Sequence, residues 1–473
     1  MSLHELSAIG PLLTLTSVIL IQMMVIAFAR NLKVTVIISC VGLLLTLLAF
    51  NPVLPMMPVA VTPLLSVDGY SVFFSGLIIV AALAVTMMGY DYFKDRGVNQ
   101  DEFFLLLLLA TLGALVLVSS THFASFILGL ELLGVSLYTM MSYPIKGVLT
   151  LEAALKYLIL SGVSSAFILF GTALLYAANG TLNFESDIES GGLYLAGGTT
   201  LVLAGILFKL SVVPFHMWTP DVYEGAPAPA TAFIATVSKG AIFAVLLRFF
   251  ADSGLYLLET VMSGLVLVAI ASILVGNLLA LRQDSVKRIL AYSSIAHLGY
   301  LMVAFIAAGL SGGRDLATEA AGYFLFAYFV TTTGAFGIVT ILSISSPDKD
   351  ISNLSDYQGL FWRRPVLALA FTLMLLSLAG IPLTIGFIGK FYIFASGVSM
   401  TLWLLIAVVI LGSGIGLFYY LRIILTMTQR IETSGEIHIP VTAGSVMLTL
   451  SGTLLLFGVY PAPLISLIRN LVL

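Results

Sequence analysis

Several long apolar stretches of this 473-residue sequence carry ionisable side chains in their interiors. Four of these residues are lysines, Lys156, Lys209, Lys239 and Lys390, and the deep carboxylate is Glu131 in ILGLELLGVS. A charge at the centre of a bilayer costs about 2.5 to 3.5 kcal/mol on insertion scales, so the default interpretation of such residues is functional. A buried lysine can release and regain a proton when an opposite charge nearby moves, which is what a proton relay requires.

Two histidines extend this set. His297 lies mid-stretch in SSIAHLGYL and is a candidate relay group, although a core histidine bonded to a neighbouring hydroxyl would look the same. His216 follows a proline and is either a relay group or a helix cap, and Lys156 follows Glu152 by four residues and could simply pair with it. For the deeper residues the alternative is a static ion pair, which adds little net stability. The predicted proton-translocation residues are Glu131, Lys209, Lys239, Lys390 and His297, with Lys156 and His216 left open.

Prolines interrupt two of the charged stretches. Pro214 has no N–H to bond the carbonyl of Leu210, which is the neighbour of Lys209. Pro382 in SLAGIPLTIGFIGK has the same effect on Leu378. In a membrane, irregular backbone is tolerated only where protein or cavity water satisfies it, so both prolines predict broken helices beside hydrated interiors. The alternative is a simple kink that neighbouring helices repair.

The composition defines the class of protein that must position these groups. Hydrophobic residues make up 60% of the chain and charged residues 9%, with mean hydropathy +1.12, whereas soluble domains hold about 25% charged residues. A single cysteine, Cys40, supplies neither an internal disulfide nor the four thiolates of an iron–sulfur cluster. The net charge of −3 and the lack of a cationic run argue against nucleic-acid binding. The N-terminus lacks a positive n-region, so the first apolar segment is expected to be a retained helix.

An all-α polytopic membrane fold with about fourteen transmembrane helices is predicted. The criterion is an apolar run of about 20 residues, enough to cross the hydrocarbon core as a helix. The predicted spans are 8–29, 32–50, 70–90, 102–120, 122–143, 151–178, 194–215, 226–250, 256–281, 287–309, 318–345, 364–398, 402–428 and 441–469.

The Lys and Arg residues in the connections and at the ends of these spans are distributed unequally between the two sides of the membrane. Thirteen lie in the odd-numbered connections, whereas three, Arg248, Arg314 and Arg469, lie in the even connections and at the termini. By the positive-inside rule both termini face away from the cytoplasm. The polar stretch 345–365 is then expected to be a cytoplasmic surface loop.

The two predicted breaks are related by position. Pro382 follows Pro214 by 168 positions and His297 follows Glu131 by 166, a step of five helices. An odd step reverses direction through the membrane, so the pattern predicts two inverted five-helix repeats with broken helices seven and twelve. The expected division is 1–101 for helices one to three, 102–251 for the first repeat, 252–430 for the second and 431–473 for helix fourteen.

Three motifs resemble those of a known family. PFHMWTPDVYEGAPAPATAFIATVSK, KRILAYSSIAHLGYL and LSLAGIPLTIGFIGKFY are similar to the antiporter-like membrane subunits of respiratory complex I, the NADH:quinone oxidoreductase. The resemblance extends over nearly the whole chain. It implies the same fourteen-helix fold and a role in proton translocation, coupled to quinone reduction in other subunits.

The resemblance also implies roles for individual residues. Glu131 matches the glutamate of helix five, and Lys209 the lysine of helix seven with which it pairs. Lys239 matches the central lysine of helix eight, and Lys390 the charged residue of helix twelve on the side toward the periplasm. A lysine at 390 favours one member of the family over the middle antiporter-like subunit, which carries an acid there.

Cofactors and partners follow from the same resemblance. The chain itself is expected to bind no cofactor and no metal, while NADH, FMN, iron–sulfur clusters and quinone belong to partner subunits. The expected partners are the lipid bilayer and other membrane subunits of complex I, both antiporter-like and small, in a bacterial inner membrane. Three alternatives remain: a subunit of a multi-subunit cation/proton antiporter with the same fold, a free-standing secondary transporter and a purely scaffolding subunit.

Overall fold

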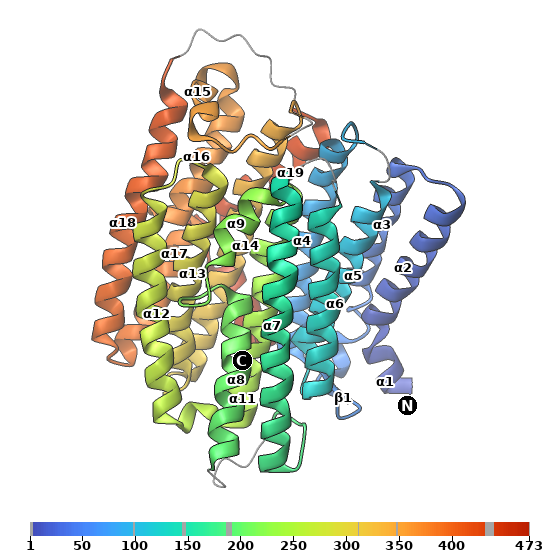
Figure 1. Ribbon diagram of the computed structural model, residues 1–473, viewed down its shortest axis with the longest axis vertical. Helices are drawn as coiled ribbons and strands as arrows, with labels where there is room; N and C mark the ends of the chain where they lie inside the picture. The colour runs from blue at the N-terminus through green and yellow to red at the C-terminus, as the bar shows by residue number, and fades with distance from the viewer. Residues whose placement is uncertain are drawn as a thin grey trace.

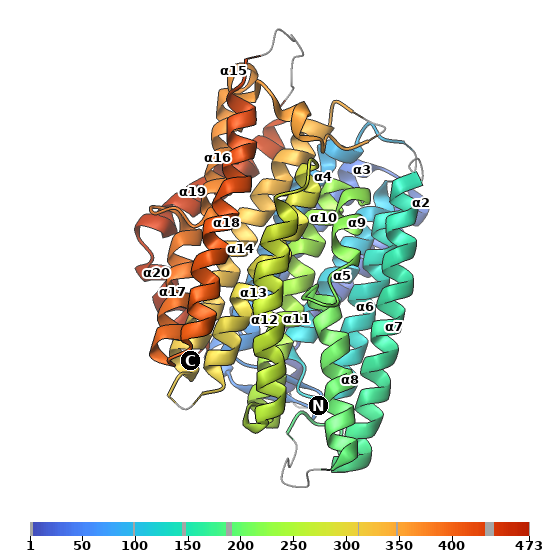
Figure 2. The same ribbon diagram turned by 60° about the vertical axis from the view of Figure 1, so that its left-hand side comes forward.

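The computed structural model describes residues 3–97, 100–143, 148–185, 192–310, 312–346, 349–430 and 439–472. Long helices stand side by side in one bundle, and the two ends of the chain lie near the same end of it (Figures 1 and 2). The fourteen predicted spans require this arrangement, because an even number of crossings puts both ends of the chain on the same side of the membrane.

The first half of the chain contains a short hairpin among its helices, in which Val59 pairs with Val67. Its elements are α1 Leu3–Ala8, α2 Gly10–Phe28, α3 Leu32–Leu48, η1 Leu54–Met56, β1 Val59–Val61, β2 Leu65–Val67, α4 Gly69–Phe93, α5 Asp101–Ser119, α6 Phe123–Ser142, α7 Val148–Asn179, α8 Leu193–Leu210, α9 Trp218–Gly225, α10 Ala228–Phe233, η3 Ile234–Ser238 and α11 Lys239–Ser253. The segment η3 is a π-helical turn, and it joins α10 and α11 into one continuous helix.

In the second half, all the named elements among the described residues are helices, joined by loops and turns. Its elements are η4 Leu255–Leu257, α12 Glu259–Ala280, α13 Val286–Ala308, α14 Arg314–Ser343, η5 Leu354–Tyr357, α15 Leu360–Arg363, α16 Pro365–Ala379, α17 Ile385–Ser399, α18 Trp403–Thr428, α19 Val441–Val459 and α20 Ala462–Val472.

The predicted spans are confirmed as helices, except for the C-terminal part of the last one. Among the described residues, twelve helices are long and apolar enough to cross a membrane. The shorter α3, and α16 with α17 taken as one broken crossing, complete the fourteen. The division into repeats stays a prediction, and residues 431–438 of its last segment lie outside the described residues.

Both predicted helix breaks are present. Helix α8 ends at Leu210, followed by Ser211 in the left-handed region (φ 63°), and Pro214 lies in the turn before α9. Helix α16 ends at Ala379, followed by Gly380 at φ 86°, and Pro382 lies in the turn before α17. Each proline thus lies inside its break, a few residues after the last helical residue.

One predicted span is wrong in its C-terminal part. The stretch 441–469 was expected to form a single helix, but α19 ends at Val459 and α20 is a separate helix. Pro461 lacks an N–H for the helical ladder and disfavours helical geometry at the residue before it. Tyr460 accordingly has φ −126° and ψ 79°, outside the helical region.

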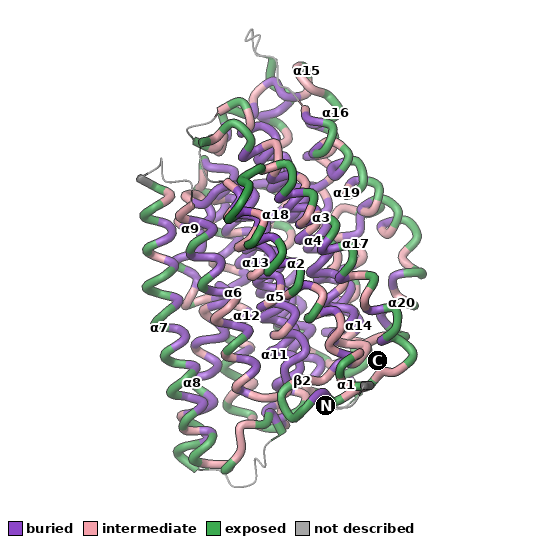
Figure 3. The backbone as a smooth tube through the Cα atoms, turned by 90° about the vertical axis from the view of Figure 1, so that its right-hand side faces the viewer, coloured by how far each residue is buried: buried purple, intermediate pink, exposed green. Residues whose placement is uncertain are grey.

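The centre of the bundle consists of α11, α13 and α14. Their residues are almost entirely buried, whereas α7 and α8 alternate between buried and exposed residues at the edge (Figure 3). Close backbone contact accompanies this packing: a Cβ on Gly113 of α5 would lie 2.6 Å from the Leu133 nitrogen of α6. Small residues at such crossings let membrane helices approach closely. The central helices are those that carry two of the predicted relay residues, Lys239 and His297.

Candidate functional site

Lys239 is the first residue of α11 and lies deep in the bundle, with 1% of its surface exposed. Its Nζ donates a hydrogen bond to Ser294 Oγ of α13 at 2.6 Å and lies 5.2 Å from the ring centre of Tyr223. In the part of the chain that the structure describes, no carboxylate pairs with it. A hydroxyl and an aromatic face are therefore the groups that stabilise its ammonium form.

A series of hydroxyl contacts leads from Lys239 to His297. Tyr328 of α14 donates to the same Ser294 Oγ at 2.7 Å, and its ring lies 5.7 Å from the His297 ring. His297 Nε2 lies 3.3 Å from the hydroxyl of Tyr420 on α18. Since hydroxyl groups both donate and accept hydrogen bonds, Ser294 and Tyr328 can pass a proton between them, whereas Tyr328 and His297 are in ring contact without a hydrogen bond among the described residues.

Lys390 of α17 is linked to His297 through the ring of Tyr300 on α13. Its Nζ donates to the carbonyl of Ala379 at 3.0 Å and lies 5.0 Å from the Tyr300 ring, which packs 5.5 Å from the His297 ring. Ala379 is the last residue of α16, so the helix break supplies the free carbonyl that accepts this bond. The negative end of the α16 dipole further favours an ammonium group there.

Glu131 and Lys209 form a second cluster, around α7. Lys209 is 3% exposed and donates to Ser161 Oγ, while Glu131 Oε1 accepts a bond from Ser165 Oγ at 2.5 Å. The two serines are four residues apart on one helix and hence lie on the same face. No direct salt bridge within 4.0 Å joins Glu131 to Lys209 among the described residues, and each of the two bonds a serine of α7 instead.

The two residues left open by the sequence occupy different surroundings. Lys156 is partly exposed and pairs with Glu152 at 2.6 Å and with Asp221 of α9 at 2.8 Å, which fits the ion-pair interpretation. His216 is buried in the turn after α8, and its Nδ1 has no hydrogen-bond partner in the described residues. Helix α9 has no side-chain cap, so His216 does not act as one here.

Sequence reasoning missed the hydroxyl groups that hold the charged residues. Ser161, Ser165, Ser294, Tyr328 and Tyr420 supply most of the contacts described above. Only Ser294 had a sequence signal, because it lies one turn before His297 in YSSIAHLGY and therefore on the same helical face.

Sequence comparisons find relatives over almost the whole chain. The family described as NADH:quinone oxidoreductase/Mrp antiporter, transmembrane region, matches residues 120–416. NADH-quinone oxidoreductase subunit N of Methylococcus capsulatus is 48% identical and covers 99% of this chain and 96% of its own length. The protein of the same name from Ectopseudomonas mendocina is 45% identical, with coverage of 99% and 96%.

Solved structures share the fold. A chain of respiratory complex I from Thermus thermophilus has a TM-score of 0.83 at 32% identity, covering 96% of this chain and 98% of that chain. A chain of the archaeal membrane-bound sulfane sulfur reductase, at 24% identity, has a TM-score of 0.85 and covers 99% and 97%. The Mrp complex of Dietzia, at 19% identity, has a TM-score of 0.87 and covers 100% and 97%. These last two likenesses show the fold alone, whereas the sequence relatives are specific: the chain belongs to the family of NADH-quinone oxidoreductase subunit N, the antiporter-like membrane subunits of respiratory complex I.

Proposed function

We propose that this chain is a non-redox, proton-translocating subunit of a NADH:quinone oxidoreductase. The observation that supports this most is the series of contacts around α13 that links Lys239, His297 and Lys390. Partner subunits supply NADH oxidation through FMN and iron–sulfur clusters, as well as quinone reduction. The chain lies in a bacterial inner membrane beside other membrane subunits of the complex, with both termini in the periplasm.

The proposed path begins on the cytoplasmic side. A proton reaches Lys239, passes through the hydroxyls of Ser294 and Tyr328, and continues to His297 and Lys390, where the groups are in ring contact and water completes the hydrogen bonds, before it leaves toward the periplasm. Because Lys239 has no carboxylate partner among the described residues, small changes in the surrounding potential decide whether it holds its proton.

Glu131 and Lys209 supply that change in potential. Two unit charges roughly 6 Å apart at an effective dielectric constant of about 20 interact by nearly 3 kcal/mol. A rearrangement that brings Glu131 and Lys209 together, or parts them, changes the electrostatic potential at Lys239, and this pair energy sets the upper scale of the change. Rotation of the Ser161 and Ser165 side chains on α7 would break their hydrogen bonds to Lys209 and Glu131 and so permit this rearrangement.

A requirement for sodium distinguishes the proposal from the cation/proton antiporter alternative. We expect proteoliposomes that contain the purified complex to pump protons at the same initial rate in sodium-free and sodium-containing buffer when NADH and quinone are supplied. The measurement is the quenching of a pH-sensitive dye inside the vesicles. A rate that drops to background without sodium would favour the antiporter.

Removal of the Ser294 hydroxyl should slow pumping. In Ser294→Ala the Lys239 ammonium loses its hydrogen bond, and bonds to charged groups contribute about 1.5 to 3 kcal/mol. We therefore expect a roughly tenfold lower pumping rate in vesicles, with Ser294→Thr close to wild type. Thr340→Val is the matched control, because among the described residues the buried hydroxyl of Thr340 bonds its own helix α14, at the Phe336 carbonyl. Wild-type rates in Ser294→Ala would remove Ser294 from the path.

A further inference from the structure

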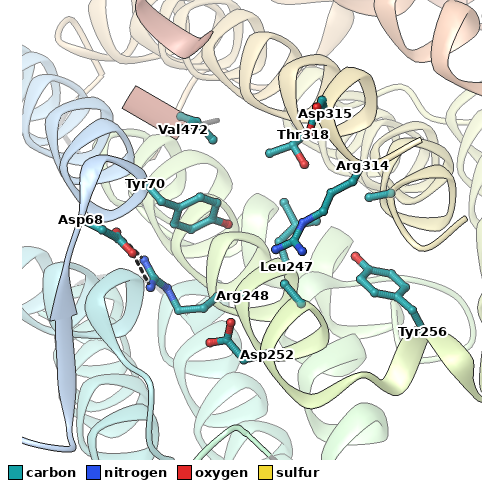
Figure 4. Close-up of a pocket in the computed structure, with 12 residues that line it drawn as sticks. Asp68, Tyr70, Leu247, Arg248, Asp252, Tyr256, Arg314, Asp315, Thr318 and Val472 are labelled. Atoms are coloured by element: carbon teal, nitrogen blue, oxygen red, sulfur yellow. Dashed lines mark hydrogen bonds and ion pairs between the residues drawn. The ribbon is translucent and has the colours of Figure 1, made fainter. Parts of the chain in front are cut away.

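A polar pocket of about 440 Å³ lies at one end of the bundle, apart from the proposed proton path. It lies where the first turns of α4 and α14 meet the last turns of α11 and α20 (Figure 4). The polar side chains that matter here are Asp68, Tyr70, Arg248, Asp252, Tyr256 and Arg314.

One wall of the pocket is fixed and electrically neutral. Arg248 donates two hydrogen bonds of 2.8 Å to the carboxylate of Asp68, which also caps α4 by accepting from the Ser71 N–H at 2.8 Å. The Tyr70 ring lies 4.9 Å from the Arg248 guanidinium, and its hydroxyl donates to the Ala244 carbonyl at 2.7 Å. Arg248 is 8% exposed, and its Nε is buried without a partner among the described residues.

The other wall carries two charged side chains, Arg314 and Asp252, that do not contact each other. Within the described chain, neither Arg314 nor Asp252 makes a salt bridge or a side-chain hydrogen bond. Arg314 points into the pocket from α14, near the Tyr256 hydroxyl, and Asp252 faces the same space from α11 (Figure 4). A guanidinium and a carboxylate that face a shared cavity without contact provide partners for a zwitterion, with one group for its anion and one for its cation.

The position of the pocket indicates where such a zwitterion comes from. Helix α4 begins at Gly69, α11 ends at Ser253 and α14 begins at Arg314, so the pocket is at the level where membrane helices end and lipid headgroups lie. Tyrosines are typical of this interface. The rest of the lining is mixed: Leu247, Ala251, Ala308 and Val472 are apolar, whereas Asp315 and Thr318 of α14 are polar. The pocket therefore suits a ligand with a charged head and an apolar remainder.

We infer that this pocket binds the headgroup of a membrane phospholipid with a primary ammonium group, of the phosphatidylethanolamine class. The phosphate bonds Arg314 and the Tyr256 hydroxyl, and the ammonium donates to Asp252. A quaternary ammonium, as in phosphatidylcholine, has no N–H to donate and fits less well. The volume is within the range of about 300 to 1,000 Å³ that is usual for small-ligand sites.

Photocrosslinking on the intact, detergent-solubilised complex tests this site. Delipidated complex receives phosphatidylethanolamine with a photoactivatable acyl chain, and mass spectrometry quantifies the labelled peptides of this chain that border the pocket. We expect wild-type labelling there and about tenfold less in Arg314→Gln, because a charge-assisted bond to phosphate is lost. Arg282→Gln, at an exposed arginine in the connection between α12 and α13, is the control and should label like wild type. Equal labelling in Arg314→Gln and wild type, with equal melting temperatures, would overturn the proposal.

Competition with unlabelled lipids then tests the headgroup. Phosphatidylethanolamine should displace the probe at about tenfold lower concentration than phosphatidylcholine, and Asp252→Asn should abolish that preference. Phosphatidylglycerol that competes as well as phosphatidylethanolamine would show that only an anion is recognised. Water-soluble glycerophosphoethanolamine that competes as well as the lipid would show that the source is not the membrane. Either outcome contradicts the proposal as stated.

Discussion

Replacement of Lys239 by alanine should leave the complex assembled and lower both proton pumping and quinone-linked NADH oxidation by about tenfold or more. Groups that transfer protons contribute roughly 10² to 10⁴-fold where the transfer limits the rate. Assembly should survive, because in the part of the chain described here Lys239 makes no ion pair, so its removal strands no buried carboxylate. Both activities can be measured in inverted membrane vesicles, with the amount of assembled complex determined in parallel.

Two control variants separate charge from proton transfer. Lys239→Arg keeps the positive charge but does not release its proton, so it should be as inactive as the alanine variant. Lys33→Ala removes an exposed lysine near the start of α3 and should change neither activity. A Lys239→Ala complex that assembles and pumps with normal stoichiometry would exclude Lys239 as a relay group.

Loss of the Asp350 carboxylate should destabilise the assembled protein by about 3 to 5 kcal/mol, the usual cost of stranding the partner of a buried salt bridge. Asp350 lies in the connection between α14 and α15 and accepts bonds from Lys287 Nζ at 2.8 Å and from the Tyr92 hydroxyl at 2.6 Å. Lys287 is 1% exposed and also donates to the Ala226 carbonyl at 2.5 Å. Asp350→Ala should thus lower the melting temperature and the yield of intact complex.

A second substitution shows whether the stranded charge is the cause. Asp350→Ala combined with Lys287→Met should recover part of the lost stability, since the unpaired ammonium is gone. Asp356→Ala, an exposed residue of the same connection, is the matched control. If Asp350→Ala alone melts like wild type, the cluster contributes no stability.

The same cluster has a defined pH dependence. Burial alone would raise the pKa of Asp350, but the Lys287 ammonium, the Tyr92 hydroxyl and the Arg96 guanidinium outweigh burial and hold this pKa below its ordinary value. A carboxyl group whose pKa is lowered in the folded state adds stability above its unfolded pKa of about 3.9. That contribution is complete at neutral pH and is lost as the pH falls through the folded-state value.

Prolines and apolar length predicted most of the fold, because both act locally. A run of some 20 apolar residues must cross the bilayer as a helix, and Pro214 and Pro382 cannot take part in the helical ladder wherever the rest of the chain lies. The same reasoning applied to Pro461 would have found the boundary between α19 and α20. Because Pro461 lies near the end of an apolar run, residues 441–469 were predicted to form a single helix.

The partners of the charged residues depend on contacts between distant segments. Lys239 and Ser294 are 55 positions apart, and Lys209 and Ser161 are 48 apart, with no spacing rule that relates them. Opposite charge favoured a Glu131–Lys209 pair, yet in the structure each of the two bonds its own serine of α7. Likewise, the polar stretch 345–365 resembles a solvated loop, and only the fold shows that its Asp350 is buried against Lys287.

The π-helical turn η3 determines the direction in which Lys239 points. In an α-helix each residue advances about 100° around the axis, and a π turn takes up one additional residue without adding a full step. Deletion of a single residue within 234–238 would therefore leave Lys239 at nearly its present angular position on a regular α-helix. If all five residues formed regular α-helix instead, the additional residue would add its own step of about 100° and turn Lys239 away from Ser294. The lysine at position 239 and the direction in which it points are thus encoded separately: the direction depends on the number of residues in the preceding segment 234–238.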